Sequence, residues 1–210
     1  MSLTIAFCTP HGIVVSADRC ITTTLESGSS FCRTMKERKL FLTPTGFAFT
    51  YAGKSTFSNR PASYWMNRFV SRFSDPNLTV ADCTRKLCVA FHSMEPTKNI
   101  VIIGAGYENG KPRVYSSSSS KRTLTDHLKG GITCIAFSGE TDLAKVIIDA
   151  KPLDTKSYTI PDTIDFVKHV TLTVSNIQRF GQTPITVSPD CDTLLIEDGR
   201  SRWVDPPAFI

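Results

Sequence analysis

The sequence has no long apolar run and no leader-like start. None of its apolar stretches approaches the ~18 residues that a membrane span requires. A basic region followed by an apolar core, the pattern of a secretory signal peptide, is also missing from its first residues. Hydrophobic residues make up 40% of the chain and charged residues 20%, which is ordinary globular composition. We therefore expect a soluble domain without a membrane partner.

Paired cysteine and histidine motifs are missing as well. The seven cysteines are odd in number and no two are spaced as CxxC, which argues against a disulfide framework and against a zinc ribbon. The four histidines show no metal-ligand spacing. Free thiols are typical of a reducing compartment, so we expect a cytoplasmic protein that binds no metal.

The excess of positive charge is small. The net charge of +5 comes from Lys and Arg residues scattered along the chain. A nucleic-acid binder usually concentrates such residues on one face, with aromatic residues between them. We therefore predict that the chain does not bind nucleic acid and that its charges form a solvated surface.

One glycine pattern resembles a cofactor motif. Gly104-Ala105-Gly106 follows an apolar stretch, as at the start of a dinucleotide-binding fingerprint. That fingerprint needs a helix directly after the glycines, with its N-terminus at the phosphates. The turn-forming Asn109-Gly110 follows instead. We therefore expect no nucleotide cofactor.

The order of apolar patterns predicts strands, two helices, strands, two helices and strands within a single domain covering residues 1–210. Strands are expected at Leu3–Phe7, Ile13–Ala17, Leu40–Leu42, Phe47–Tyr51, Asn99–Gly104, Pro112–Ser116, Gly131–Phe137, Ile185–Val187, Thr193–Ile196 and Arg202–Val204, with a long loop or irregular edge at Ile21–Arg33. Helices are expected within Ser55–Phe73, after Thr79, at Glu140–Asp149 and from Pro161. Segregated runs of this kind indicate an α+β fold. We predict a four-layer αββα sandwich, with two antiparallel sheets between helix layers.

The N-terminus carries the first chemical signal. Removal of Met1 by methionine aminopeptidase, expected because the next residue is small, would leave Ser2 with a hydroxyl and a free α-amine. Such a residue contains nucleophile and base together, because an α-amine titrates near ~7.7 and can accept the hydroxyl proton. Many proteins begin with Met-Ser, so this observation alone carries little weight.

The motifs that follow Ser2 strengthen the interpretation of Ser2 as a nucleophile. The segment Ser2–Asp18 resembles the opening of proteasome β-type subunits, in which a nucleophile is followed by a strand, a turn such as His-Gly, and a strand ending in small residues and Asp. The resemblance continues in the same order through Arg38–Phe41, Phe47–Gly53, Tyr107–Tyr115, and Ile135–Glu140 with Leu143-Ala144. It implies an N-terminal nucleophile (Ntn) hydrolase, closest in impression to bacterial proteasome-like proteins. It further implies cleavage of peptides or unfolded proteins without a cofactor, and a homo-oligomeric ring; a regulatory ATPase partner is left open.

The resemblance also assigns roles. Ser2 matches the nucleophile, and Lys39 the lysine that stabilises the developing alkoxide. Asp18 matches the acid that pairs with this lysine. Gly53 would donate its backbone N–H to the oxyanion, and Ser138 matches a serine that hydrogen-bonds the N-terminal group.

Each residue also has a plain structural alternative. Asp18 could cap a turn, and Lys39 could be a surface lysine. Gly53 could start a helix, and Ser138 could cap the helix expected at Glu140. By the same alignment Tyr51 lies near the floor of the pocket for the substrate side chain before the scissile bond, which suggests a shortened pocket.

Three departures from the family pattern favour a second hypothesis. The nucleophile is Ser rather than Thr, and the segment between Asp18 and Lys39 is longer than usual. The late Asp of the family is missing from 175–181, where Asn176 or Gln178 could substitute only as a hydrogen-bonding group. A catalytically silent scaffold with Met1 retained is therefore an alternative, as is an Ntn amidase or transpeptidase.

Overall fold

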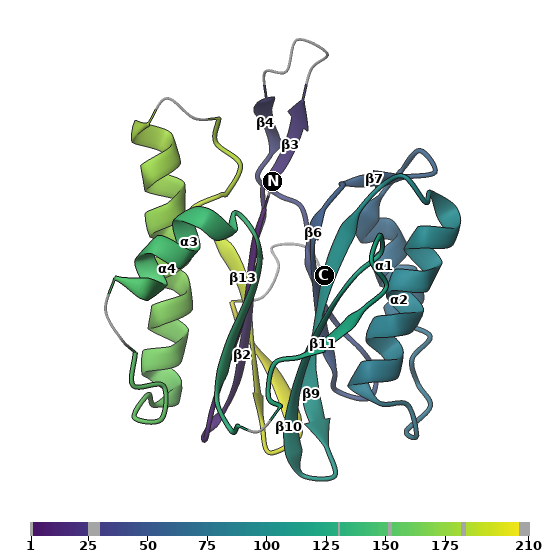
Figure 1. Cartoon of the computed structure of the whole chain (residues 1–210), viewed down its shortest axis with the longest axis vertical. Coiled ribbons are helices and arrows are strands. Elements are labelled where there is room, and N and C mark those ends of the chain that lie inside the picture. Colours follow the sequence, from purple (N-terminus) through teal and green to yellow (C-terminus); the bar gives the residue numbers. More distant parts are fainter. Residues whose placement is uncertain (1, 25–29, 130, 151–152, 182–183, 206–210) are drawn as a thin grey trace.

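The computed structural model describes residues 2–24, 30–129, 131–150, 153–181 and 184–205. Its strands form two five-stranded antiparallel sheets (Figure 1). The first sheet has the order β12 (Cys134–Gly139), β1 (Leu3–Thr9), β2 (Gly12–Asp18), β13 (Cys191–Glu197) and β14 (Arg200–Asp205). The second has the order β11 (Leu124–Asp126), β10 (Lys111–Ser118), β9 (Ile100–Glu108), β6 (Ala48–Gly53) and β5 (Leu40–Leu42).

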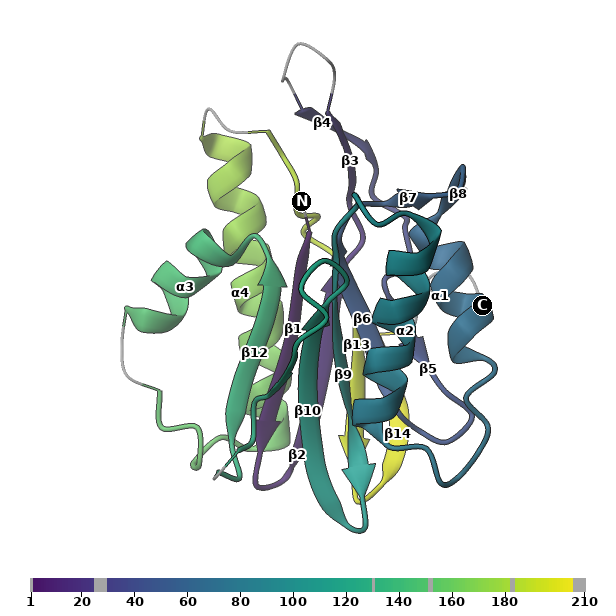
Figure 2. The ribbon, with the colours of Figure 1, turned by 45° about the vertical axis from the view of Figure 1, so that its right-hand side comes forward.

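Helices accompany each sheet. Helices α1 (Ala62–Val70) and α2 (Val80–Met94) lie beside the second sheet, where α2 contacts β9 and β10. Helices α3 (Thr141–Asp149) and α4 (Ile160–Phe180) lie beside the first, where α4 contacts β1 and β2 (Figure 2). The expected mixture of helices and antiparallel sheets is confirmed. The four-layer αββα order stays a prediction.

Local sequence explains where the long helices begin. The Thr79 side chain accepts a hydrogen bond from the Asp82 N–H at 3.0 Å and so caps α2, the helix predicted after Thr79. Helix α4 starts with a full capping box between Thr159 and Asp162, and Pro161 occupies its first turn, where a proline is tolerated. The sequence pattern had not indicated this capping box.

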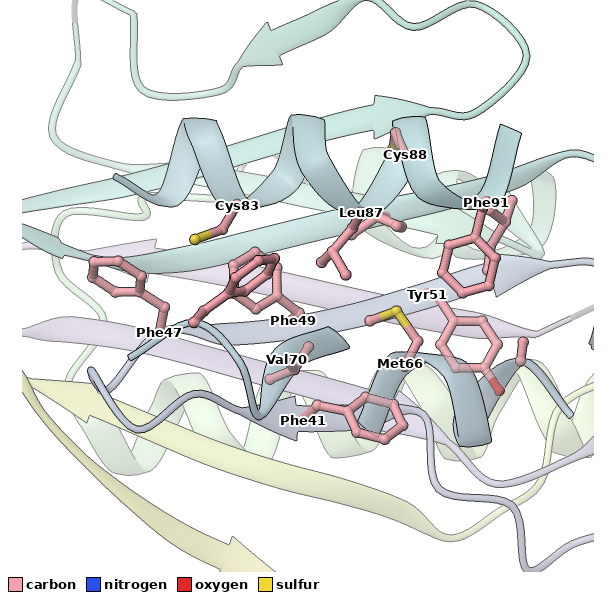
Figure 3. Close-up of a cluster of buried hydrophobic side chains, with 14 of the residues drawn as sticks. Phe41, Phe47, Phe49, Tyr51, Met66, Val70, Cys83, Leu87, Cys88 and Phe91 are labelled. Atoms are coloured by element: carbon pink, nitrogen blue, oxygen red, sulfur yellow. The ribbon is translucent and has the colours of Figure 1, made fainter. Parts of the chain in front are cut away.

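Three apolar clusters hold the elements together. One lies between α1, α2 and the second sheet and is rich in aromatic rings, including Phe49 and Phe91 (Figure 3). A second joins the two sheets through small side chains such as Ala105 and Ala136. The third packs α3 and α4 on the first sheet. Every residue of β1 and β2 is buried, because these central strands are covered on both faces.

Several sequence-based boundaries need correction. A long loop or irregular edge was expected at Ile21–Arg33, but this part contains a strand pair, β3 (Ile21–Thr24) and β4 (Ser30–Thr34); residues 25–29 lie outside the described part. The strand expected at Ile185–Val187 is wrong, because the Thr186 and Val187 N–H groups donate to a side chain of α4 instead of a strand. Strand β11 and the short pair β7 (Thr56–Phe57) and β8 (Arg60–Pro61) were not predicted.

Gly104 owes its identity to packing. It lies in β9, which leads into a hairpin with β10 as expected, and α2 packs over it. A Cβ atom at this position would come within 2.4 Å of Thr84 Oγ1 and 2.7 Å of a Phe49 ring carbon. The glycine therefore allows α2 to approach the sheet closely.

Replacing this glycine should loosen the contact between α2 and β9. We expect Gly104→Ala to lower the free energy of unfolding by about 1–3 kcal/mol through overpacking, measured by urea denaturation. Gly131→Ala is the matched control, because its nearest neighbour would lie 3.7 Å away. Equal stabilities of the two variants would contradict this account of the packing.

Candidate active site

Lys39 is the centre of a buried polar cluster at one end of the sheets. The residue directly precedes β5, and only 1% of it is exposed. Its Nζ donates to Ser2 Oγ at 2.8 Å, to Asp18 Oδ1 at 2.8 Å and to the Cys20 carbonyl oxygen. Three acceptors match the three protons of an ammonium group, so the buried cation is fully satisfied.

Asp18 ends β2 and is fully buried. Besides Lys39, its carboxylate accepts hydrogen bonds from the backbone N–H groups of Leu3 at 2.9 Å, Cys20 at 2.7 Å and Ser188 at 3.2 Å. A buried carboxylate is tolerable when it is paired and hydrogen-bonded in this way. Asp18 therefore ties the start of β1 to a loop 170 residues further along the chain.

The main chain of Ser2 is held from the other side by β12. Its carbonyl oxygen accepts a hydrogen bond from the Glu140 N–H at 2.6 Å. Gly139 has φ +103°, and a Cβ atom there would lie 1.7 Å from the Ser2 oxygen. Only a glycine allows this approach, both for its conformation and for the space. Backbone contacts on both sides thus fix the position of Ser2.

A neutral amide, the side chain of Gln178, supports this arrangement through residues that surround Ser2 rather than through Ser2 itself. The Gln178 side chain of α4 donates to Glu140 Oε2 at 3.2 Å and to Thr186 Oγ1 at 2.8 Å. Its oxygen accepts from the N–H groups of Thr186 at 2.9 Å and Val187 at 3.0 Å. Gln178 therefore joins α4, the loop before β13 and the residue that holds the Ser2 carbonyl. Of the two predicted substitutes for the missing Asp, Gln178 is hydrogen-bonded to this network, whereas among the described residues Asn176 forms no hydrogen bond to it.

A cavity of about 910 Å³ opens beside Ser2 and Lys39. Gly53, Tyr51 and Ser138 also line it. Gly53 ends β6 with φ +120°, and a Cβ atom there would lie 2.6 Å from the Asn99 carbonyl oxygen, so a side chain would not fit. The cavity lies where a bound molecule would touch the Ser2 hydroxyl and the end of β6.

Tyr51 forms a firm wall of this cavity. It is 2% exposed, stacks on Phe41 at 6.3 Å between ring centroids, and belongs to the aromatic cluster of Figure 3. Burial, together with the nearby carboxylates of Glu37 and Asp18, raises the pKa of Tyr51 well above its ordinary value. The ring is therefore a neutral, fixed surface near neutral pH.

The structure brings the predicted residues together. Lys39 directly contacts both Ser2 and Asp18, and the alternative of a surface lysine is wrong. Gly53 ends a strand and does not start a helix. Ser138 lies in β12, and α3 is preceded by Glu140, so the helix-capping alternative is wrong too. In the described part of the chain, Ser138 forms no side-chain hydrogen bond. Met1 lies outside the described residues.

Two contributors were missed by sequence reasoning. The Ser188 N–H binds Asp18, and the Glu140 N–H binds Ser2. Gly139-Glu140 is part of a motif that the family resemblance identified, so its adjacency to Ser2 could have been inferred from that motif. Ser188 lies far along the chain, within no recognisable pattern.

Other chemistry has weaker support. Cys8, Cys20, Cys83, Cys88, Cys134 and Cys191 are free thiols. Burial raises the pKa of Cys8 and Cys134 to about 12, which makes them poor nucleophiles. Within the described ranges, no three His, Cys, Asp or Glu residues are grouped as a metal ion would require. In the same part of the chain, no helix is both long and apolar enough to cross a membrane.

Comparison with solved structures identifies the fold. A mutant of Anbu from Hyphomicrobium sp. strain MC1 matches with a TM-score of 0.67 and 17% sequence identity, over 98% of this chain and 89% of that one. Anbu, the ancestral beta-subunit, from Yersinia bercovieri matches with a TM-score of 0.69 and 14% identity, over 99% of this chain and 89% of that one. The chain has an Anbu-like fold. No protein-family model matches the sequence, and no curated protein does.

These neighbours correct the resemblance drawn from the sequence. The assignment to proteasome β-type subunits is wrong as it stood, because both of these solved structures are Anbu proteins. The connection to β-type subunits is therefore indirect. At 14–17% identity the likeness concerns the fold, and the chemistry of this chain has to be argued from its own residues.

The Lys39–Asp18 pair should make a large contribution to stability. Asp18→Asn leaves Lys39 as a buried, uncompensated charge, and we expect it to lower the free energy of unfolding by about 3–5 kcal/mol. Asp205→Asn is the control: Asp205 pairs with Lys168 at 2.7 Å, but both side chains are substantially exposed. Its loss should cost about 1 kcal/mol or less. Guanidinium denaturation of both variants tests this, and equal losses would contradict the role given to Lys39.

Proposed function

We propose that this chain is an N-terminal nucleophile hydrolase that cleaves peptide bonds through an acyl-enzyme on Ser2. The observation that carries the proposal is the buried contact of Lys39 Nζ with both Ser2 Oγ and Asp18 Oδ1 at the edge of a large cavity. A cation 2.8 Å from a serine hydroxyl stabilises the alkoxide form of that hydroxyl. The proposal also includes the four-layer αββα order of an Ntn hydrolase.

The proposed reaction needs Ser2 to be the first residue of the mature chain. After removal of Met1, the α-amine accepts the hydroxyl proton while Oγ attacks the peptide carbonyl carbon. The tetrahedral intermediate collapses, the C–N bond breaks, and the leaving amine takes up the proton. Water, deprotonated by the same α-amine, then hydrolyses the ester and releases Ser2.

Electrostatic stabilisation would come from two directions. Lys39 lies beside the hydroxyl oxygen, and its charge is kept in place by the buried Asp18. The backbone N–H of Gly53, on the cavity wall, is the proposed donor to the oxyanion. The missing side chain of Gly53 lets a substrate carbonyl approach the backbone closely. Loss of one such donor typically reduces the rate by ~100-fold or more.

Intact-mass spectrometry tests the nucleophile. We expect native protein to lack Met1 and to gain the mass of one β-lactone molecule after incubation, because the hydroxyl beside Lys39 is activated. Ser2→Ala should abolish the adduct, whereas Ser93→Ala, at an exposed position of α2, should retain it. Lys39→Met should slow labelling by at least ~100-fold, as for loss of one stabilising charge. Retained Met1 without an adduct would contradict the proposal and favour a silent scaffold.

We further propose that the protein acts in the cytoplasm as a homo-oligomer. The described cysteines are free thiols, in keeping with a reducing compartment. Helices α3 and α4, which pack against each other, carry exposed apolar side chains: Val146 is 69% exposed, Ile177 43% and Phe180 80%. Large exposed apolar residues on neighbouring helices are typical of a protein–protein contact. A ring of identical subunits, as the sequence resemblance implied, would cover them.

Sedimentation velocity tests the assembly. We expect particles several times heavier than the 23.2 kDa chain. Phe180→Glu should shift the distribution toward monomer, because it places a charge in the proposed contact. Val89→Glu is the matched control at a 53% exposed apolar position of α2, beside the other sheet. A monomer of wild-type protein at all concentrations would refute the oligomer.

A further inference from the structure

The charged side chains that the described residues contribute to the cavity are all positive. Among the described residues that line it are four cations, Arg33, Lys39, Lys54 and Lys98, and none of these described residues is Asp or Glu. The rest of the polar lining consists of hydroxyl groups and the amide of Asn99, which can donate hydrogen bonds. A cavity of this composition attracts negative charge from solution and repels positive charge.

Two of these cations are already neutralised. Lys39 is paired with Asp18 and buried. Lys98 forms an ion pair with Glu95 at 2.6 Å and also donates to the Thr56 carbonyl oxygen at 3.1 Å. Their charges are used within the protein, so they contribute little to attraction of a ligand.

Arg33 and Lys54 remain available. Both are exposed, and within the described residues neither forms an ion pair. Arg33 comes from β4, in the hairpin that rises beyond the N-terminal end of β1 (Figure 1). Lys54 directly follows Gly53 at the end of β6, and its backbone N–H is bonded to the Asn99 oxygen at 3.0 Å. Two elements thus each present one uncompensated cation to the same cavity.

We propose that the cavity selects peptides with acidic side chains close to the bond that Ser2 attacks, with Arg33 and Lys54 as the groups that recognise the carboxylates. This inference rests on the proposed function for its account of cleavage. Recognition itself needs no reaction: a Glu or Asp side chain forms ion pairs with the two cations, and a Lys or Arg side chain at the same place is repelled. Tyr51, neutral and fixed, limits the depth to which a side chain enters.

Binding to a catalytically blocked protein separates recognition from chemistry. The probes are three fluorescent peptides of one sequence with both ends capped, which differ at a single position as Glu, Gln or Lys. Capping removes the terminal carboxylate, so an acidic preference reports on the side chain. On Ser2→Ala, fluorescence anisotropy should give a Kd for the Glu peptide roughly tenfold below that for the Lys peptide, with Gln between them. The difference should shrink as NaCl is raised from about 0.05 to 0.5 M, because exposed charges are screened.

Charge reversal provides the decisive control. In the Ser2→Ala background, Arg33→Glu with Lys54→Glu should invert the order, so that the Lys peptide binds best. Lys129→Glu with Lys145→Glu changes the net charge equally at exposed positions that do not line the cavity, and should leave the order unchanged. Equal binding of all three peptides, or inversion by the control pair, would overturn the acidic preference. A capped peptide with a second Glu should bind at least as tightly as the capped single-Glu peptide. Weaker binding of the two-Glu peptide would count against the acidic preference.

Turnover measurements keep the two proposals distinguishable. With active protein, kcat/KM should follow the same order of Glu, Gln and Lys peptides. Acidic preference in binding without turnover or β-lactone labelling would refute the hydrolase while the recognition stands. Turnover without any dependence on peptide charge would refute the recognition while the hydrolase stands.

Discussion

A buried ammonium group imposes conditions on everything around it. Lys39 lies in the protein interior, where an isolated charge would cost several kcal/mol. Here that cost is offset because Asp18 lies 2.8 Å away and because Ser2 and Cys20 supply the other acceptors. Asp18 in turn needs donors, and these come from the main chain of β1, of the segment after β2 and of the loop before β13. One ion pair therefore fixes three segments that are distant in sequence.

The same demand for partners explains how the site manages without the late Asp of the family pattern. Gln178 offers two donors and an acceptor, and all are used by Glu140, Thr186 and Val187. A neutral amide organises the loop without adding a second negative charge near Lys39. The positive charge beside Ser2 is then balanced by Asp18 alone in direct contact, as the proposed stabilisation of the alkoxide by Lys39 requires.

Sequence reasoning succeeded where the signal is local and failed where it depends on distant partners. The hairpin of β1 and β2 follows from a short turn between apolar runs, and the spacing from Ser2 to Asp18 follows from that hairpin. The role of Lys39 came from the family motif, since composition alone would place a lysine on the surface. Ile185–Val187 looks like a strand by its β-branched residues, yet its N–H groups are taken by Gln178 from another element. No pattern within that segment could reveal this.

Burial divides the cations of the cavity into two kinds with different uses. A cation that is buried and paired, such as Lys39, acts over one hydrogen bond on an atom that the fold places beside it. An exposed cation, such as Arg33 or Lys54, stays hydrated and interacts weakly with each ligand. It attracts a negatively charged ligand from solution, however, before that ligand is bound in the cavity. The first kind can stabilise charge that develops during a reaction, and the second can select which chains enter. A cavity with both kinds of cation, and with no carboxylate among its described lining residues, is suited to bring a negatively charged chain to a serine hydroxyl.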